Sequence, residues 1–144
     1  MTHDAMLFLH FRIGEHNMAL STDLIVEVMP LSDLKPMRRA PDGIAGSYDY
    51  RGHIVPVVDL TLVETGRPSR RSMSTRIVVV RYPAQHEQLI GLMAEGATET
   101  WRINPDRFAP FAPGPCGLVQ RVRVEELVPQ ALLTCLREQA GVAS

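Results

Sequence analysis

Short runs in which apolar and polar residues alternate recur along the chain and predict β-strands. In the first run, Leu7–Ile13, every odd-numbered residue is apolar, while the even-numbered residues include His10 and Arg12. A period of two is typical of a strand with one buried face. Residues 14–17 suit a turn, so we expect residues 18–20 to return as the second strand of a hairpin.

The pattern after this hairpin predicts a short helix. Ser21 can cap a helix, and Asp23 suits its first turn because acidic side chains are favoured there. Glu27 lies off the apolar helical face, and Pro30 ends the pattern. That face would consist of Leu24, Ile25, Val28 and Met29.

The most strongly strand-forming run, Ile54–Leu60, follows an arginine-glycine pair. Its three valines are β-branched and favour extended backbone, and Gly52 tolerates the positive φ of a tight turn. We therefore expect a hairpin turn at Arg51–His53. Pro56 cannot donate to a strand ladder and indicates an edge strand or a bulge, so part of this sheet rim is a candidate partner surface.

A polar segment, Thr65–Ser74, reads as an exposed linker, after which short strands are expected again. These strands are predicted at residues 76–82, 89–93, 98–103 and 120–124. Asn104–Gly117 holds four prolines and two glycines and is expected to be a loop. Pro129 suits the first residue of a terminal helix. Tight connections between short strands favour small barrels over a parallel sheet with crossover helices.

The chain is therefore expected to be mainly β, with one domain spanning residues 1–144. Within it we predict a first barrel at 6–64, a second barrel at 75–128 and a C-terminal helix at 129–140. A barrel of roughly 60 residues is marginally stable alone, so the two should pack together.

Composition and charge narrow the function. The 15 basic and 16 acidic residues give a net charge of −1, which provides no overall field toward nucleic acid or membrane. Cys116 and Cys135 form no metal or disulfide pattern and suit a reducing compartment. The apolar run at residues 5–9 is too short for a secretory signal or a membrane span. We expect a cytoplasmic protein that meets membranes only through a partner.

No motif indicates catalysis. The chain lacks a nucleophile elbow, a phosphate-binding glycine loop and a dinucleotide fingerprint. Asp59 suits a surface or turn-capping role better than a catalytic one, because no second such aspartate exists to share a proton. The five histidines have no metal-binding spacing, and His53 reads as an exposed turn residue. We therefore predict no enzyme activity, no catalytic residue, no metal and no cofactor.

Two features of the sequence involve arginine. The cluster in Arg67–Arg76 is interpreted as a solvated linker, with a small-barrel nucleic-acid-binding surface as the alternative, although few aromatic residues accompany it. An arginine on a tight turn, such as Arg51, is usually solvated. Its planar donors also suit a carboxylate, either within the protein or across an interface, and the residues alone leave both readings open.

Taken together, these pieces resemble the CheW-like family, the adaptor proteins of bacterial chemosensory arrays. The resemblance covers about Leu7–Ile103, and its most specific element is Arg51–Leu60. The other matching pieces are Phe11–Gly14 with Met18–Leu20, Val26–Val28, Ile77–Val80 and Ile90–Leu92.

The resemblance implies two packed SH3-like five-stranded barrels and no active site. It also implies a non-enzymatic adaptor that couples the cytoplasmic tips of methyl-accepting chemoreceptors to a CheA-type histidine kinase, recruited to receptor arrays at the inner membrane. In such proteins Glu27 and Arg51 would pair near the partner surfaces. Gly52, Ile25 and Val55 are further candidates for partner binding.

Some segments depart from the family pattern. Ala94–Gly96 replaces a hydrophobic-aspartate pair, and Tyr48–Tyr50 is more polar than the usual Ile-Asn-Leu. Gly117–Leu127 is shorter than the family pattern, so a second barrel that lacks part of its strands is left open as an alternative. These departures also leave open an adaptor whose pathway has an output other than motility, such as cyclic-dinucleotide synthesis.

Overall fold

The computed structural model describes residues 5–82, 88–115 and 117–135, and in them the chain is mainly β. The strands are β1 (Met6–Ile13), β2 (His16–Ser21), β3 (Ile25–Pro30), β4 (Ile44–Tyr50), β5 (His53–Asp59), β6 (Arg76–Arg81), β7 (Leu89–Ile103), β8 (Phe111–Gly114) and β9 (Gly117–Val122). Two short helices are α1 (Leu60–Thr65) and α2 (Val124–Leu127), and residues 130–135 are also helical.

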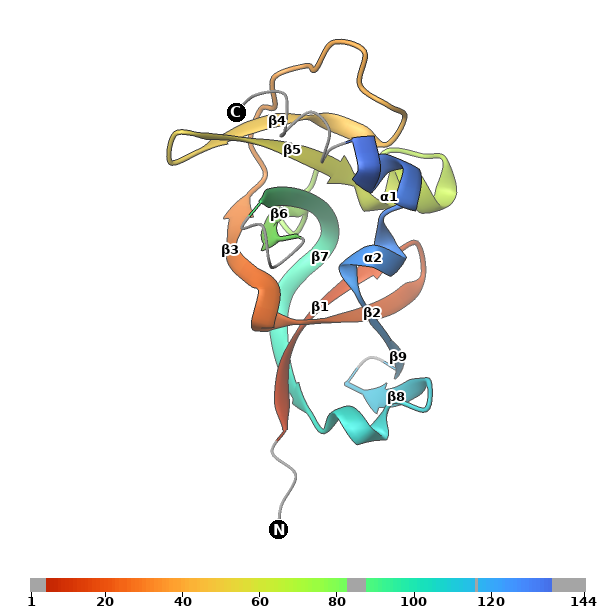
Figure 1. The fold of residues 1–144 in the computed structure, drawn as a ribbon. Helices are drawn as coiled ribbons and strands as arrows, with labels where there is room; N and C mark the ends of the chain where they lie inside the picture. Colours follow the sequence, from red (N-terminus) through yellow and green to blue (C-terminus); the bar gives the residue numbers. More distant parts are fainter. Residues whose placement is uncertain (1–4, 83–87, 116, 136–144) are drawn as a thin grey trace.

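The long strand β7 joins two groups of strands (Figure 1). Its first part pairs with β5 and β6, and its second part pairs with β1. Gly96 lies where the pairing changes and has a φ of +67°, a conformation that other residues rarely adopt. The strands predicted separately at residues 89–93 and 98–103 are therefore one bent strand.

Within the described ranges, the first group of strands is β3, β6, β7, β5 and β4, and the second is β7, β1, β2, β9 and β8. This pairing differs from the predicted barrels at 6–64 and 75–128. β1 and β2 join the C-terminal strands, and β2 pairs in parallel with β9. The hydrophobic pattern identifies strands but says nothing about long-range partners, so chain order was a poor guide.

The second group is not trimmed. The predicted loop at 104–117 contains β8, which forms an antiparallel hairpin with β9. β8 lies at the end of the strand order, and Pro113 is tolerated there because an edge strand does not need every backbone donor. The prolines that suggested a loop are therefore compatible with a strand at this position.

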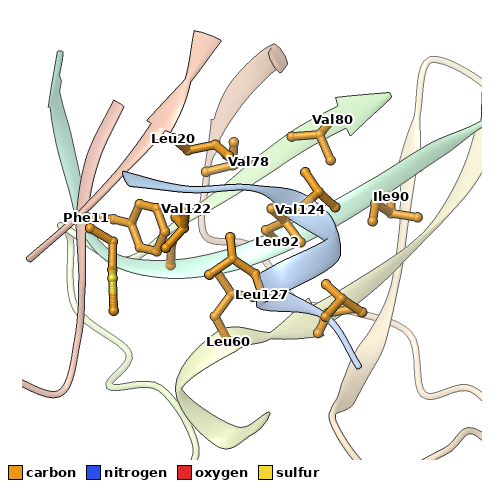
Figure 2. Close-up of a cluster of buried hydrophobic side chains, with 14 of the residues drawn as sticks. Phe11, Leu20, Leu60, Val78, Val80, Ile90, Leu92, Val122, Val124 and Leu127 are labelled. Carbon is orange, nitrogen blue, oxygen red and sulfur yellow. The ribbon is translucent and has the colours of Figure 1, made fainter. Parts of the chain in front are cut away.

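The main core lies between the two groups. Side chains from both groups surround α2, whose Val124 and Leu127 are buried (Figure 2). Leu132 and Leu133 of the 130–135 helix complete this core. Two smaller apolar clusters belong to the individual groups, one around Val55 and Val57 in the first and one around Phe8 and Val119 in the second. Packing of the two groups is thus the principal source of buried apolar surface.

The helix predicted at residues 24–29 is wrong, because these residues form β3 after a short 3₁₀ turn at Thr22–Leu24. β3 pairs with β6, and its β-branched side chains suit the extended conformation. At the C-terminus, the carbonyl of Pro129 accepts hydrogen bonds from Leu132 and Leu133, so the helix begins about where it was predicted. Residues 136–140 of that predicted helix, like Cys116, lie outside the described residues.

Asp59 has a structural role. Its side chain is only 4% exposed, and its Oδ1 accepts a hydrogen bond from the Leu62 amide at 3.1 Å, which caps α1. Its Oδ2 accepts a hydrogen bond from the Ser69 amide at 2.9 Å. Asp59 thus ties the middle of the arginine-containing linker to the start of α1, in agreement with the predicted turn-capping role, although it is buried rather than at the surface.

Candidate functional site

The β4–β5 hairpin ends in a tight turn at one edge of the molecule (Figure 1). Tyr50 pairs with His53, and the two residues between them, Arg51 and Gly52, have φ values of +50° and +86°. Positive φ at both central residues is the mark of a type I′ turn, which matches the twist of the flanking strands. The Asp49 carboxylate accepts a hydrogen bond from the Gly52 amide at 3.0 Å and holds the turn. The predicted hairpin is therefore present.

This turn brings Arg51 to Glu27, which is 24 residues earlier on β3. The Nη2 atom of Arg51 lies 3.4 Å from Glu27 Oε1. The two side chains are 75% and 39% exposed, and an ion pair so accessible to water contributes only about 0–1 kcal/mol to stability. The pair therefore contributes little to folding, and both charges remain accessible at the surface.

Tyr50 is the third member of this cluster. Its hydroxyl donates a hydrogen bond to Glu27 Oε1 at 2.7 Å, and the Arg51 guanidinium carbon lies 5.2 Å from the centre of its ring. The hydrogen bond to Glu27 and, next, burial raise the pKa of Tyr50, while the positive charge of Arg51 opposes this shift. We call Glu27, Tyr50 and Arg51 the hairpin cluster.

Comparison with known proteins identifies the domain. The profile of the CheW-like domain family matches residues 7–127. The chain belongs to this family. It is a family of chemotaxis scaffold and adaptor proteins rather than of enzymes.

Two curated relatives agree with the family. The chain is 25% identical over 100 residues to "Chemotaxis protein CheW" of Helicobacter pylori, which is 69% of this chain and 59% of the relative. It is 31% identical over 72 residues to "Protein FrzA" of Myxococcus xanthus, which is 50% of this chain and 45% of the relative. The chain thus spans about half the length of the curated relatives that it matches.

A solved structure confirms the fold. The scaffolding protein TtCheW from Thermoanaerobacter tengcongensis superposes with a TM-score of 0.75, covering 89% of this chain and 90% of that one, at 20% sequence identity. The predicted CheW-like β fold is therefore correct. Neither the family nor these relatives support the alternative of nucleic-acid binding through Arg67–Arg76.

The five residues predicted for partner binding in this CheW-like domain occupy different environments. Arg51, Gly52 and Glu27 are at the surface around the hairpin turn. Ile25 is half-buried and packs on the main core, and Val55 is only 1% exposed. Val55 therefore supports the hairpin from inside and cannot touch a partner directly.

Sequence reasoning missed two residues around this turn. Ile54 is 67% exposed and presents an apolar side chain next to Val55. Its position in an alternating strand, opposite to Val55, was the available signal. Tyr50 was noted only as more polar than the family pattern, and nothing in the sequence showed that its hydroxyl reaches β3.

Other chemistry has little support in the part of the chain that is described. In residues 5–82, 88–115 and 117–135, no three histidine, cysteine, aspartate or glutamate side chains gather as metal ligands would. None of the helices in these ranges has the length and apolar character needed to cross a bilayer.

Proposed function

We propose that this protein is a non-enzymatic adaptor that couples methyl-accepting chemoreceptors to a CheA-type histidine kinase in chemosensory signalling. The observation that carries the proposal is the hairpin cluster, in which a buried tyrosine and a β3 glutamate contact the exposed turn arginine of a domain that belongs to the CheW-like family. The similarity to a chemotaxis protein and to a scaffolding protein is consistent with this role.

The chemistry of the turn suits an acidic partner. A guanidinium has five N–H donors, and Arg51 uses one of its nitrogens for the long contact to Glu27. Its remaining donors can bind a carboxylate of a partner, which arginine recognises better than lysine does. Ile54 adds an exposed apolar contact on the next strand. We expect a transient interface of roughly 1,600 Å² or less, with an apolar centre and a charged rim.

The proposal includes a location. We propose that the protein acts in the cytoplasm and reaches receptor arrays at the inner membrane through its partners rather than by inserting into the bilayer. A net charge of −1 provides no attraction to an anionic membrane surface, which supports recruitment by protein contacts.

The test is Arg51→Glu, assayed by co-sedimentation with receptor signalling tips and histidine kinase from the same cell. A glutamate at this position faces Glu27 and reverses the charge offered to the partner, so we expect at least a tenfold loss of affinity while the circular dichroism spectrum stays unchanged. Wild-type affinity in this variant would contradict the proposal.

Arg39→Glu is the matched control. Arg39 is also an exposed arginine in a left-handed conformation, with a φ of +56°, and it makes no ion pair within the described residues. It should bind normally. An equal loss in both variants would mean that overall charge, rather than the hairpin cluster, determines binding.

A further inference from the structure

The two contacts to Glu27 differ in strength. The Tyr50 hydroxyl lies 2.7 Å from Glu27 Oε1, within the usual range for a hydroxyl that donates to a carboxylate. Arg51 Nη2 lies 3.4 Å from the same oxygen, well beyond the roughly 2.8 Å of a strong guanidinium–carboxylate bond. Tyr50 is therefore the side chain that fixes the position of Glu27, and Arg51 is held more loosely.

Tyr50 is itself rigid. It is 6% exposed and belongs to the apolar cluster of the first strand group, beside Val55 and Met93. Its backbone closes the hairpin by pairing with His53. The ring also lies below the Arg51 guanidinium, at a distance where a cation and an aromatic ring attract each other. The buried Tyr50 side chain thus holds the Glu27 carboxylate through its hydroxyl and supports the Arg51 guanidinium through its ring.

We infer that Tyr50 is a positioning residue that orders both Glu27 and Arg51 and so determines how this surface is presented to a partner. As applied to binding, the inference rests on the proposed adaptor function.

The first experiment compares Tyr50→Phe with Tyr50→Leu. The phenylalanine keeps the core packing and the ring below Arg51 but loses the bond to Glu27, so affinity for receptor tips or kinase should fall roughly five- to tenfold. The leucine also loses the ring and should bind more weakly still. Tyr48→Phe is the control, since no hydrogen bond of the Tyr48 hydroxyl is seen within the described residues. Equal affinity of wild type and Tyr50→Phe would overturn the inference.

Combining two variants distinguishes a role of the Tyr50 hydroxyl through Glu27 from a purely structural role. If the hydroxyl acts through Glu27, then Tyr50→Phe should cause no further loss of binding in a Glu27→Ala background. Additive losses would show that the hydroxyl acts by another route and would overturn the inference.

A second measurement does not depend on any partner. The difference in alkaline absorbance titration between the wild type and Tyr50→Phe isolates the Tyr50 phenol from the other two tyrosines. Because the hydrogen bond to Glu27 is the main cause of its raised pKa, Glu27→Ala should lower the pKa of Tyr50. No change would overturn the inference even if the protein binds its partners. A clear decrease in a protein that binds neither partner would retain the ordering role and reject the proposed adaptor function.

Discussion

Each of the two strand groups ends in an antiparallel hairpin, β4–β5 in the first and β8–β9 in the second. In both, an exposed aliphatic residue precedes a buried valine. Ile54 is 67% exposed and Val55 is 1% exposed, while Leu118 is 66% exposed and Val119 is fully buried. The two hairpins are therefore built on the same alternation.

The hairpins differ in what accompanies the exposed residue. Ile54 pairs across the strands with Asp49, close to the hairpin cluster, whereas Leu118 pairs with Pro113. The outer face of the second hairpin carries two exposed apolar side chains, Leu118 and Phe111, of which Phe111 is 48% exposed. The comparison shows that the same scaffold can present a directional, charged surface or an apolar one. The first hairpin carries the hydrogen bond and the ion pair that join Glu27 to Tyr50 and Arg51, and we propose that this arrangement selects a partner.

The largest expected effect is on the free energy of unfolding. Measuring it tests whether the two hairpins are equivalent as scaffolds. Val55→Ala and Val119→Ala each remove two methyl groups from a closely packed cluster and should each lower the free energy of unfolding by roughly 2 kcal/mol. Ile54→Ala and Leu118→Ala should change it by no more than about 0.5 kcal/mol. Urea denaturation of the four variants provides the values. A large loss in either exposed position would contradict the alternation.

The next effect concerns recognition, where the hairpins should differ. Ile54→Lys places a charge beside the hairpin cluster and should weaken receptor or kinase binding roughly tenfold, because it disrupts an apolar contact near Arg51. Leu118→Lys makes the same change on the second hairpin and should have a smaller effect. Co-sedimentation at matched protein concentration compares them, and an equal loss would indicate that exposed apolar area, rather than the charged turn, determines binding.

Local features of this fold could be predicted from the sequence. The alternation in Leu7–Ile13 and the turn at Arg51–His53 depend on residues close together in the chain, and both are present in the structure. Glu27 was placed on the wrong type of element, because the apolar pattern of residues 24–29 fits a helix as well as a half-buried strand. The pairing of β3 with β6 resolves this ambiguity, and no local feature of the sequence predicts that pairing.

The candidate site was harder to predict from the sequence for the same reason. The approach of Glu27 to Arg51 was expected only from the family resemblance, and the structure agrees with that expectation. The Tyr50–Glu27 hydrogen bond joins residues 23 positions apart and depends on how the hairpin lies over β3. Hydrophobic periodicity carries no information about such a contact, since it reports which face is buried and not which polar atoms meet.

The smallest effect is a pH dependence that only the first hairpin should show. The hydrogen bond to Glu27 and burial raise the pKa of Tyr50 in the folded protein above its ordinary value of about 10. Between about pH 10 and the folded pKa, the unfolded chain releases this proton more readily than the native protein, so stability falls as pH rises. Below pH 10 the phenol is protonated in both states, and the stabilising contribution is complete. Urea unfolding at pH 8 and at several values above 10 should therefore show a steeper loss in the wild type than in Tyr50→Phe, whereas Tyr48→Phe should stay closer to the wild type, because the charge of Tyr48 is the smallest cause of the raised pKa of Tyr50. Parallel curves for the wild type and Tyr50→Phe would show that the phenol is not coupled to Glu27, and the first hairpin would then differ from the second only in its surface charge.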